Sequence, residues 1–148
     1  MRVHISTDHA AFECKNYLVE RLGETGHDVV DHGADDYDAQ DDYPTFIIPC
    51  AEAVAAEPGS LGIVLGGSGN GEQIAANKVK GIRAVLATSP ELARLGREHN
   101  SANIVAIGGR NQSLEESWAI AREFLETPFS GDERHQRRID AITAYENR

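Results

Sequence analysis

Cysteine, long apolar runs and positive charge are all scarce in this chain of 148 residues. The two cysteines, Cys14 and Cys50, lack the spacing of a metal-binding pair, so we expect reduced thiols in a cytoplasmic protein. No segment has the uninterrupted apolar length of a membrane span. The opening MRVHIST leads directly into an expected strand, without the hydrophobic region of a signal peptide.

The charge balance argues against a nucleic-acid partner. Asp and Glu number 24 against 14 Lys and Arg, which gives a formal net charge of −10. Nucleic acid would be repelled by this field and needs a basic face. An anionic small molecule would instead need a local cationic pocket. The length suits one domain, and we expect residues 1–148 to form it, with a C-terminal helix from about residue 132.

Short β-branched segments alternate with segments of helical periodicity along the chain. Strands are expected at residues 2–6, 28–33, 61–67, 83–88 and 103–109, and helices at 11–24, 45–56, 71–78, 89–99, 113–126 and about 132–146. This alternation indicates βαβ units and a parallel sheet covered on both faces. The predicted fold class is therefore a three-layer α/β/α, Rossmann-like domain with a five-stranded parallel sheet.

In such a sheet, ligands bind beyond the carboxyl ends of the strands. The turn after the third strand reads GGSGNGE and contains Gly67, Ser68, Gly69, Asn70 and Gly71. Backbone N–H groups in such a turn can converge on an oxyanion, helped by the start of a helix. The alternative is a tight turn that binds nothing. The dinucleotide fingerprint fits the glycine spacing poorly, and a P-loop is excluded because no Lys-Ser or Lys-Thr pair follows.

A carboxylate, Glu72, follows this loop directly. It would repel a bound phosphate, but it suits the removal of a proton from a carbon next to a carbonyl. The loop N–H groups would then stabilise the enediolate oxygen that forms. The alternative is a solvated glutamate favoured by the helix dipole.

Further polar residues follow other elements. Asp8 and His9 end the first strand, where Asp8 could instead cap a helix. His99 and Asn100 end the fourth helix. His99 could protonate a sugar ring oxygen near neutral pH, or could simply be a cation favoured by the helix terminus.

Two arginines near the C-terminus provide the candidate cationic pocket. Arg134 and Arg138 are four residues apart and share a helical face. A carboxylate partner would explain them, but on so acidic a chain a substrate phosphate is the sharper interpretation. Arg110, just after the fifth strand, could reach the same pocket.

These motifs together resemble the ribose-5-phosphate isomerase B family, which includes the galactose-6-phosphate isomerase subunits. The resemblance rests on the segments DHAAFECK, DYP, GGSGNGEQIAANKVKGIRA, REHNSANIVAIGGR and RHQRRID, in the same order over nearly the whole chain. It implies a Rossmann-like fold, a homodimer with active sites at the subunit interface, and neither metal nor cofactor. Whether dimers pair into tetramers stays open.

The resemblance also implies roles for individual residues. Glu72 matches the catalytic base of the branch that uses a glutamate, and His99 matches the acid of ring opening, a role for which Asp8 competes. Much of the family has its base, a cysteine, at the position of Gly66 here. The other matches are sugar-phosphate contacts: Asp8, His9, Gly67, Ser68, Gly69, Asn70, Gly71, Asn100, Arg110, Arg134 and Arg138.

The expected function is the reversible isomerisation of ribose 5-phosphate and ribulose 5-phosphate. A four-carbon or six-carbon sugar phosphate is the closest alternative. A non-catalytic nucleotide- or flavin-binding module on the same fold is a more distant one, and it leaves Glu72 and His99 unexplained.

Overall fold

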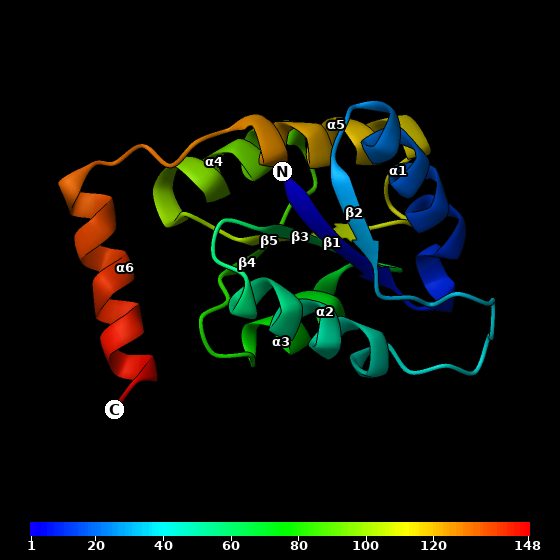
Figure 1. Cartoon of the computed structure of the whole chain (residues 1–148), viewed down its shortest axis with the longest axis horizontal. Helices are drawn as coiled ribbons and strands as arrows, with labels where there is room; N and C mark the ends of the chain where they lie inside the picture. The colour runs from blue at the N-terminus through cyan, green and yellow to red at the C-terminus, as the bar shows by residue number, and fades with distance from the viewer.

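The computed structural model describes all 148 residues, and its elements alternate as the sequence predicts (Figure 1). In chain order they are β1 (Arg2–Thr7), η1 (His9–Ala11), α1 (Phe12–Glu24), β2 (Asp28–Asp31), α2 (Pro44–Ala56), β3 (Leu61–Gly66), α3 (Asn70–Asn77), β4 (Ala84–Leu86), α4 (Pro90–Asn100), β5 (Ile104–Gly108), α5 (Leu114–Glu126) and α6 (Glu133–Glu146). The one element not predicted is η1, a single 3₁₀ turn after β1.

The five strands form one parallel sheet in the order β2-β1-β3-β5-β4. Helices α1, α4 and α5 cover one face of the sheet, and α2 and α3 cover the other (Figure 1). The predicted three-layer fold class is therefore confirmed. The strand order reverses between β1 and β3, and this is where open α/β sheets form a crevice for ligands.

Local sequence signals explain several helix boundaries. Ser113 and Glu116 form a capping box at the start of α5, with both reciprocal hydrogen bonds present. Ser89 caps α4, and Pro90 occupies its first position. Trp118 packs in the core between the sheet and the helices α1, α4 and α5. The two free cysteines are buried in the cores on opposite faces of the sheet.

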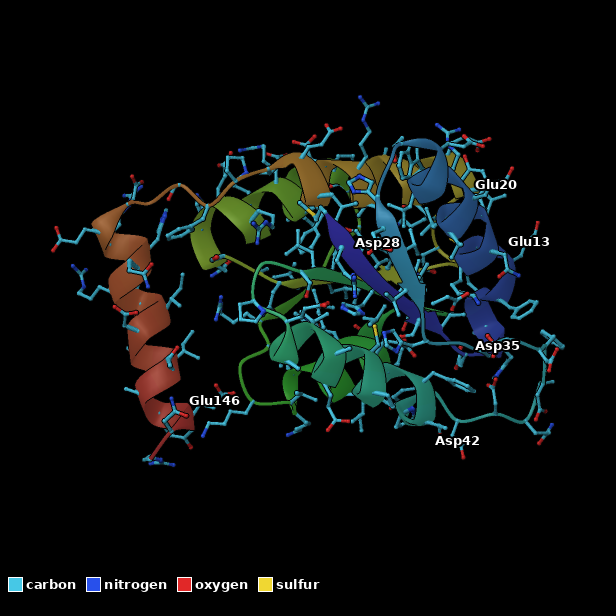
Figure 2. The ribbon with its side chains drawn as sticks, viewed as in Figure 1. Glu13, Glu20, Asp28, Asp35, Asp42 and Glu146 are labelled. Carbon is cyan, nitrogen blue, oxygen red and sulfur yellow. The ribbon has the colours of Figure 1, made fainter.

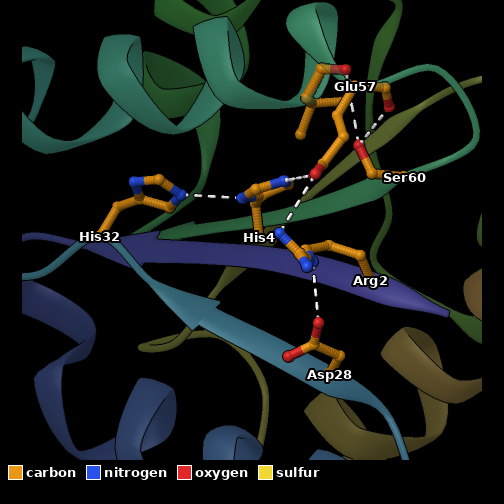
Figure 3. Close-up of polar contacts among 7 residues, drawn as sticks. Arg2, His4, Asp28, His32, Glu57 and Ser60 are labelled. Carbon is orange, nitrogen blue, oxygen red and sulfur yellow. Dashed lines mark hydrogen bonds and ion pairs between the residues drawn. The ribbon is translucent and has the colours of Figure 1, made fainter.

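A polar network joins β1, β2 and the end of α2 (Figure 3). The buried ring of His4 contacts His32 Nε2 through Nδ1 at 2.9 Å and Glu57 Oε1 through Nε2 at 2.7 Å. Arg2 adds ion pairs to Glu57 and Asp28, at 3.1 and 2.9 Å. Burial, and then the neighbouring His4, lowers the pKa of His32. The network thus depends on at least one imidazole staying neutral.

Helix α6 lies to one side of the molecule, beyond α4 (Figure 1). It contacts α4 through the rings of His135 and His99, whose centroids are 4.4 Å apart. Near its end, Glu146 Oε2 accepts a hydrogen bond from the Gly81 N–H at 3.1 Å.

No helix of the chain combines the length and the apolar character needed to cross a membrane. Figure 2 shows acidic side chains spread over α1, β2, the loop before α2 and α6.

Candidate active site

The candidate site lies where β1 and β3 end side by side. These strands pair in parallel from Val3↔Leu61 to Thr7↔Leu65, so the residues after Thr7 and after Gly66 emerge at the same edge. Strand β5 pairs with β3 on the other side, and Gly66 lies opposite Gly108. The site therefore sits at the reversal of strand order, where the fold predicts it.

Glu72 is at the centre of this region. It lies in the first turn of α3, and only 4% of its surface is exposed. Its carboxylate lies directly over Gly66, where a Cβ on residue 66 would overlap all three carboxyl atoms. Gly69, just before the helix, has φ +87°, a left-handed conformation that glycine adopts without strain. The loop and the missing side chain at position 66 together place the carboxylate.

The environment of Glu72 favours a proton acceptor. The net shift of the Glu72 pKa is upward from the ordinary 4.5. Burial is the largest cause and raises the pKa, and the Asp8 carboxylate also raises it. The backbone N–H groups of Glu72 and Gly69 act in the opposite direction. A carboxylate with a raised pKa is a stronger base than one in water. The solvated, helix-start glutamate considered from the sequence is therefore excluded, because this carboxyl is buried.

Asp8 and His9 follow β1 and Arg110 follows β5, on the turns either side of the loop that carries Glu72. Asp8 is buried and also caps η1, since its Oδ1 accepts a hydrogen bond from the Ala10 N–H at 2.9 Å. The capping role considered from the sequence is thus confirmed, although the same carboxylate faces Glu72. Arg110 lies over Gly67, and its N–H donates to the Gly67 carbonyl at 3.0 Å. One chain therefore brings together the glycine loop, the carboxylate and one cation.

Two residues for which no role was predicted also belong here. Asp41 Oδ1 lies 2.6 Å from His9 Nδ1, across 32 positions of the chain. The ring of Tyr43 lies against Gly71, where a Cβ would collide with it. Tyr43 belongs to the DYP segment, which could have drawn attention to it. The pairing of Asp41 has no sequence signal, because the other aspartates of its loop look the same in sequence.

Asp8, His9 and Asp41 are also the one group whose side chains could hold a metal ion, with candidate ligand atoms within 4.8 Å of one another. Sequence spacing indicated no such cluster, and the fold assembles it from two separate turns. His9 Nδ1 already pairs with Asp41, so an ion would have to replace that contact.

His99 and Asn100 lie at the opposite edge of the sheet. They end α4, and the Asn100 carbonyl accepts a hydrogen bond at 2.8 Å from Nε of Arg83, which directly precedes β4. A six-residue strand such as β3 spans about 16 Å, so this edge is far from Glu72 of the same chain. Both residues are exposed. One chain therefore does not bring His99 to the glycine loop.

The arginines of α6 are also remote from Glu72. Arg134 and Arg138 lie on exposed positions of the helix, and the acidic neighbour of Arg134 is Asp132 at 4.0 Å. Arg138 has no ion pair within the chain. These two cations lie on exposed positions of α6, and the exposed His99 at the end of α4 packs against His135 of α6.

The protein is thus a Rossmann-like α/β domain with a buried carboxylate beside a glycine-rich loop. A family model described as Ribose/Galactose Isomerase matches residues 3–142. The chain belongs to this family of isomerases. Ribose-5-phosphate isomerase B from Mycobacterium tuberculosis is 56% identical over 146 residues, which cover 99% of this chain and 90% of that protein.

Solved structures agree with this assignment. Ribose-5-phosphate isomerase B from Mycoplasma genitalium, solved with bound ribulose 5-phosphate, matches with a TM-score of 0.95 at 39% identity, over 99% of this chain and 96% of that one. The type B ribose 5-phosphate isomerase of Trypanosoma cruzi matches with a TM-score of 0.94 at 42% identity, over 99% of both chains.

Proposed function

We propose that this protein interconverts ribose 5-phosphate and ribulose 5-phosphate through an enediolate, as a cytoplasmic homodimer. The observation that carries the proposal is the buried Glu72 carboxylate, set over Gly66 at the start of α3 beside the glycine loop. The names of the relatives support the substrate.

Glu72 is the base in this mechanism. It removes the proton from C2 of the open-chain aldose, and the electron pair forms the enediolate with charge on the C1 oxygen. The backbone N–H groups of residues 67–71, at the positive end of α3, hold that oxygen. The O2 hydroxyl proton passes to the C1 oxygen, Glu72 returns its own proton to C1, and the C2–O2 bond becomes the carbonyl of the ketose. The position that a cysteine occupies in much of the family is filled here by the carboxylate itself.

A separate group opens the furanose before this step. There are two candidates for this group. His99 could act as the acid that protonates the ring oxygen, and Asp8 is the carboxylate beside Glu72. In one chain, Asp8 is close to the base and His99 is at the far edge of the sheet. His99 can act only if a second subunit supplies it.

A second subunit would also complete the phosphate site. Arg134, Arg138, His99 and Asn100 all lie on one exposed surface formed by α6 and the end of α4. A two-fold symmetric dimer would place this surface of each chain over the glycine loop of the other. The guanidinium groups would then hold the phosphate, remote from C1 and C2, and so orient the reacting carbons.

The test is turnover of ribose 5-phosphate by purified protein, with EDTA present, beside erythrose 4-phosphate and allose 6-phosphate. The proposal predicts preferred conversion of the pentose and its loss in Glu72→Gln. Preference for another sugar would keep the base and change the substrate. No turnover of any sugar would overturn the proposal and leave a binding module to be tested.

A further inference from the structure

One aspartate of the acidic loop before α2 differs from its neighbours. The segment from residue 35 to residue 42 contains five aspartates. Four of them are exposed, namely Asp35, Asp36, Asp38 and Asp42, and Figure 2 labels Asp35 and Asp42 on this loop. The side chain of Asp41 is only 9% exposed. Burial of a carboxylate in a solvated loop is costly and requires a compensating partner.

That partner is a single residue, His9. Asp41 Oδ1 accepts one hydrogen bond from the His9 backbone N–H at 3.1 Å and lies 2.6 Å from Nδ1 of the same imidazole. The other oxygen, Oδ2, is buried and has no hydrogen-bond partner. All the hydrogen bonds of this carboxylate thus go to His9, and they fix its backbone and its ring together.

This contact determines which edge of the imidazole is available. A carboxylate accepts hydrogen bonds, so Nδ1 carries a proton and Nε2 is the nitrogen left for a ligand. The His9 side chain is 24% exposed, and its ring forms part of the wall of a cavity of about 360 Å³ that Phe12, Tyr37 and Gly109 also line. The ring is therefore partly accessible to a bound molecule.

The same contact affects the charge of the ring. The hydrogen bond that the His9 ring donates to Asp41 is the largest influence on the pKa of His9 and raises it. Burial lowers the pKa, the charges of Asp8 and Asp41 raise it, and Arg110 lowers it, with a net upward shift. Tyr37 packs edge-on to the ring at 6.3 Å, and the exposed Glu13 lines the same cavity.

We infer that Asp41 is a positioning residue of the active site, which holds the His9 imidazole in one orientation with Nε2–H presented to the anionic substrate beside Arg110. The inference rests on the proposed function, in which His9 contacts the sugar phosphate. It gives the acidic loop a role in the site that its composition does not indicate. Asp41 acts through His9 and does not itself take part in proton transfer at C1 or C2.

The test compares Asp41→Asn with Asp36→Asn, a matched control that removes the same charge from an exposed position of the same loop. The pKa and tautomer of His9 are followed by NMR, with its signals assigned through their loss in His9→Asn. In wild type and Asp36→Asn, Nδ1 should be protonated and the pKa should lie above the ordinary 6.5. In Asp41→Asn the pKa should fall toward that value.

Kinetics give a second, independent result. Loss of a charge-assisted hydrogen bond should raise KM for ribose 5-phosphate about tenfold in Asp41→Asn, with a smaller change in kcat. The increase should shrink at acid pH, where His9 is protonated in both proteins. In a His9→Asn background, Asp41→Asn should leave KM unchanged, because its effect passes through the ring.

Several outcomes would overturn the inference. One such outcome is that His9 of the wild-type protein has a pKa at or below 6.5, or that its Nδ1 carries no proton. This measurement uses the wild-type protein and so does not depend on the folding of a variant. Another is a KM increase in Asp41→Asn that is the same at every pH, as expected of a merely structural loop contact. The NMR titration does not require turnover, so it distinguishes failure of this inference from failure of the proposed function.

Discussion

Replacing Gly66 by Ala should displace the base without unfolding the protein. Gly66 lies in β3, outside the left-handed region, so its backbone accepts alanine. The added Cβ would overlap the carboxyl group of Glu72. Non-bonded carbon atoms rest about 3.5–4 Å apart, so the carboxylate would have to move by about 1 Å or more. A misplacement of about 1 Å at a reacting group costs about a hundredfold in rate.

We therefore expect kcat for ribose 5-phosphate in Gly66→Ala to fall about a hundredfold, with a smaller change in KM, because the phosphate contacts proposed for Arg134 and Arg138 are remote from residue 66. The strain of the extra methyl group should cost about 1–3 kcal/mol of stability, which circular dichroism would register as a lowered Tm. The assay is steady-state turnover at a temperature where the variant is folded.

Gly23→Ala is the matched control. Gly23 lies in α1, and a Cβ there would meet no atom within 4 Å. The variant should keep full activity and gain about 0.5–1 kcal/mol, since glycine is unfavourable in a helix. A Gly66→Ala protein that is folded and retains kcat within about threefold of wild type would refute the placement of Glu72 as the reacting group.

Two further predictions address the dimer and acid stability. If the site is shared between subunits, mixing the inactive variants Glu72→Gln and His99→Asn should restore about a quarter of wild-type activity. Half of randomly assorted dimers are mixed, and each mixed dimer has one intact site of two. If no activity returned after verified subunit exchange, the shared site would be contradicted. The pKa of His32 is lowered in the folded protein, so His32 binds a proton more readily in the unfolded chain. The folded state therefore has its full stability from this group above the ordinary pKa of 6.5. It loses stability as the pH falls from there through the folded-state pKa of His32. Tm should therefore drop on acidification over this range, and less so in His32→Gln; equal drops in both proteins would exclude the network with His4 as the cause.

The arrangement of strands and helices followed from sequence because each element carries its own signal. Ser113 with Glu116, and Ser89 with Pro90, set helix starts through contacts within four residues, which a sequence displays directly. The η1 turn was missed because it is a single turn, capped by Asp8, with no periodic pattern of its own.

The site was predictable only where its residues follow strand ends. Glu72, Asp8 and Arg110 meet because β1, β3 and β5 are neighbours in a parallel sheet. The contact of Asp41 with His9 crosses 32 positions between two loops, and no periodicity encodes it. The close approach of Glu72 to Gly66 likewise depends on the loop backbone, in which only the left-handed Gly69 has a sequence signature.

The remoteness of His99 from Glu72 was not among the predictions, although the alternation of strands and helices implies it. Helices that connect parallel strands run back across the sheet, so the end of α4 must lie at the edge opposite the glycine loop. A site that needs both residues therefore needs two subunits. The resemblance implied such an interface, and the geometry of a single chain supplies its physical reason.

The central claim is that Glu72 carries the proton between C2 and C1. The most direct measurement is isomerisation of ribose 5-phosphate in D₂O, followed by NMR, with wild type beside Glu72→Gln. We expect deuterium from solvent to appear at C1 of the ribulose 5-phosphate formed by wild type, and almost no product from the variant. Product without solvent deuterium would show that hydrogen passes from C2 to C1 without exchange with solvent, and undiminished turnover by Glu72→Gln would contradict the claim, because another group would then be the base.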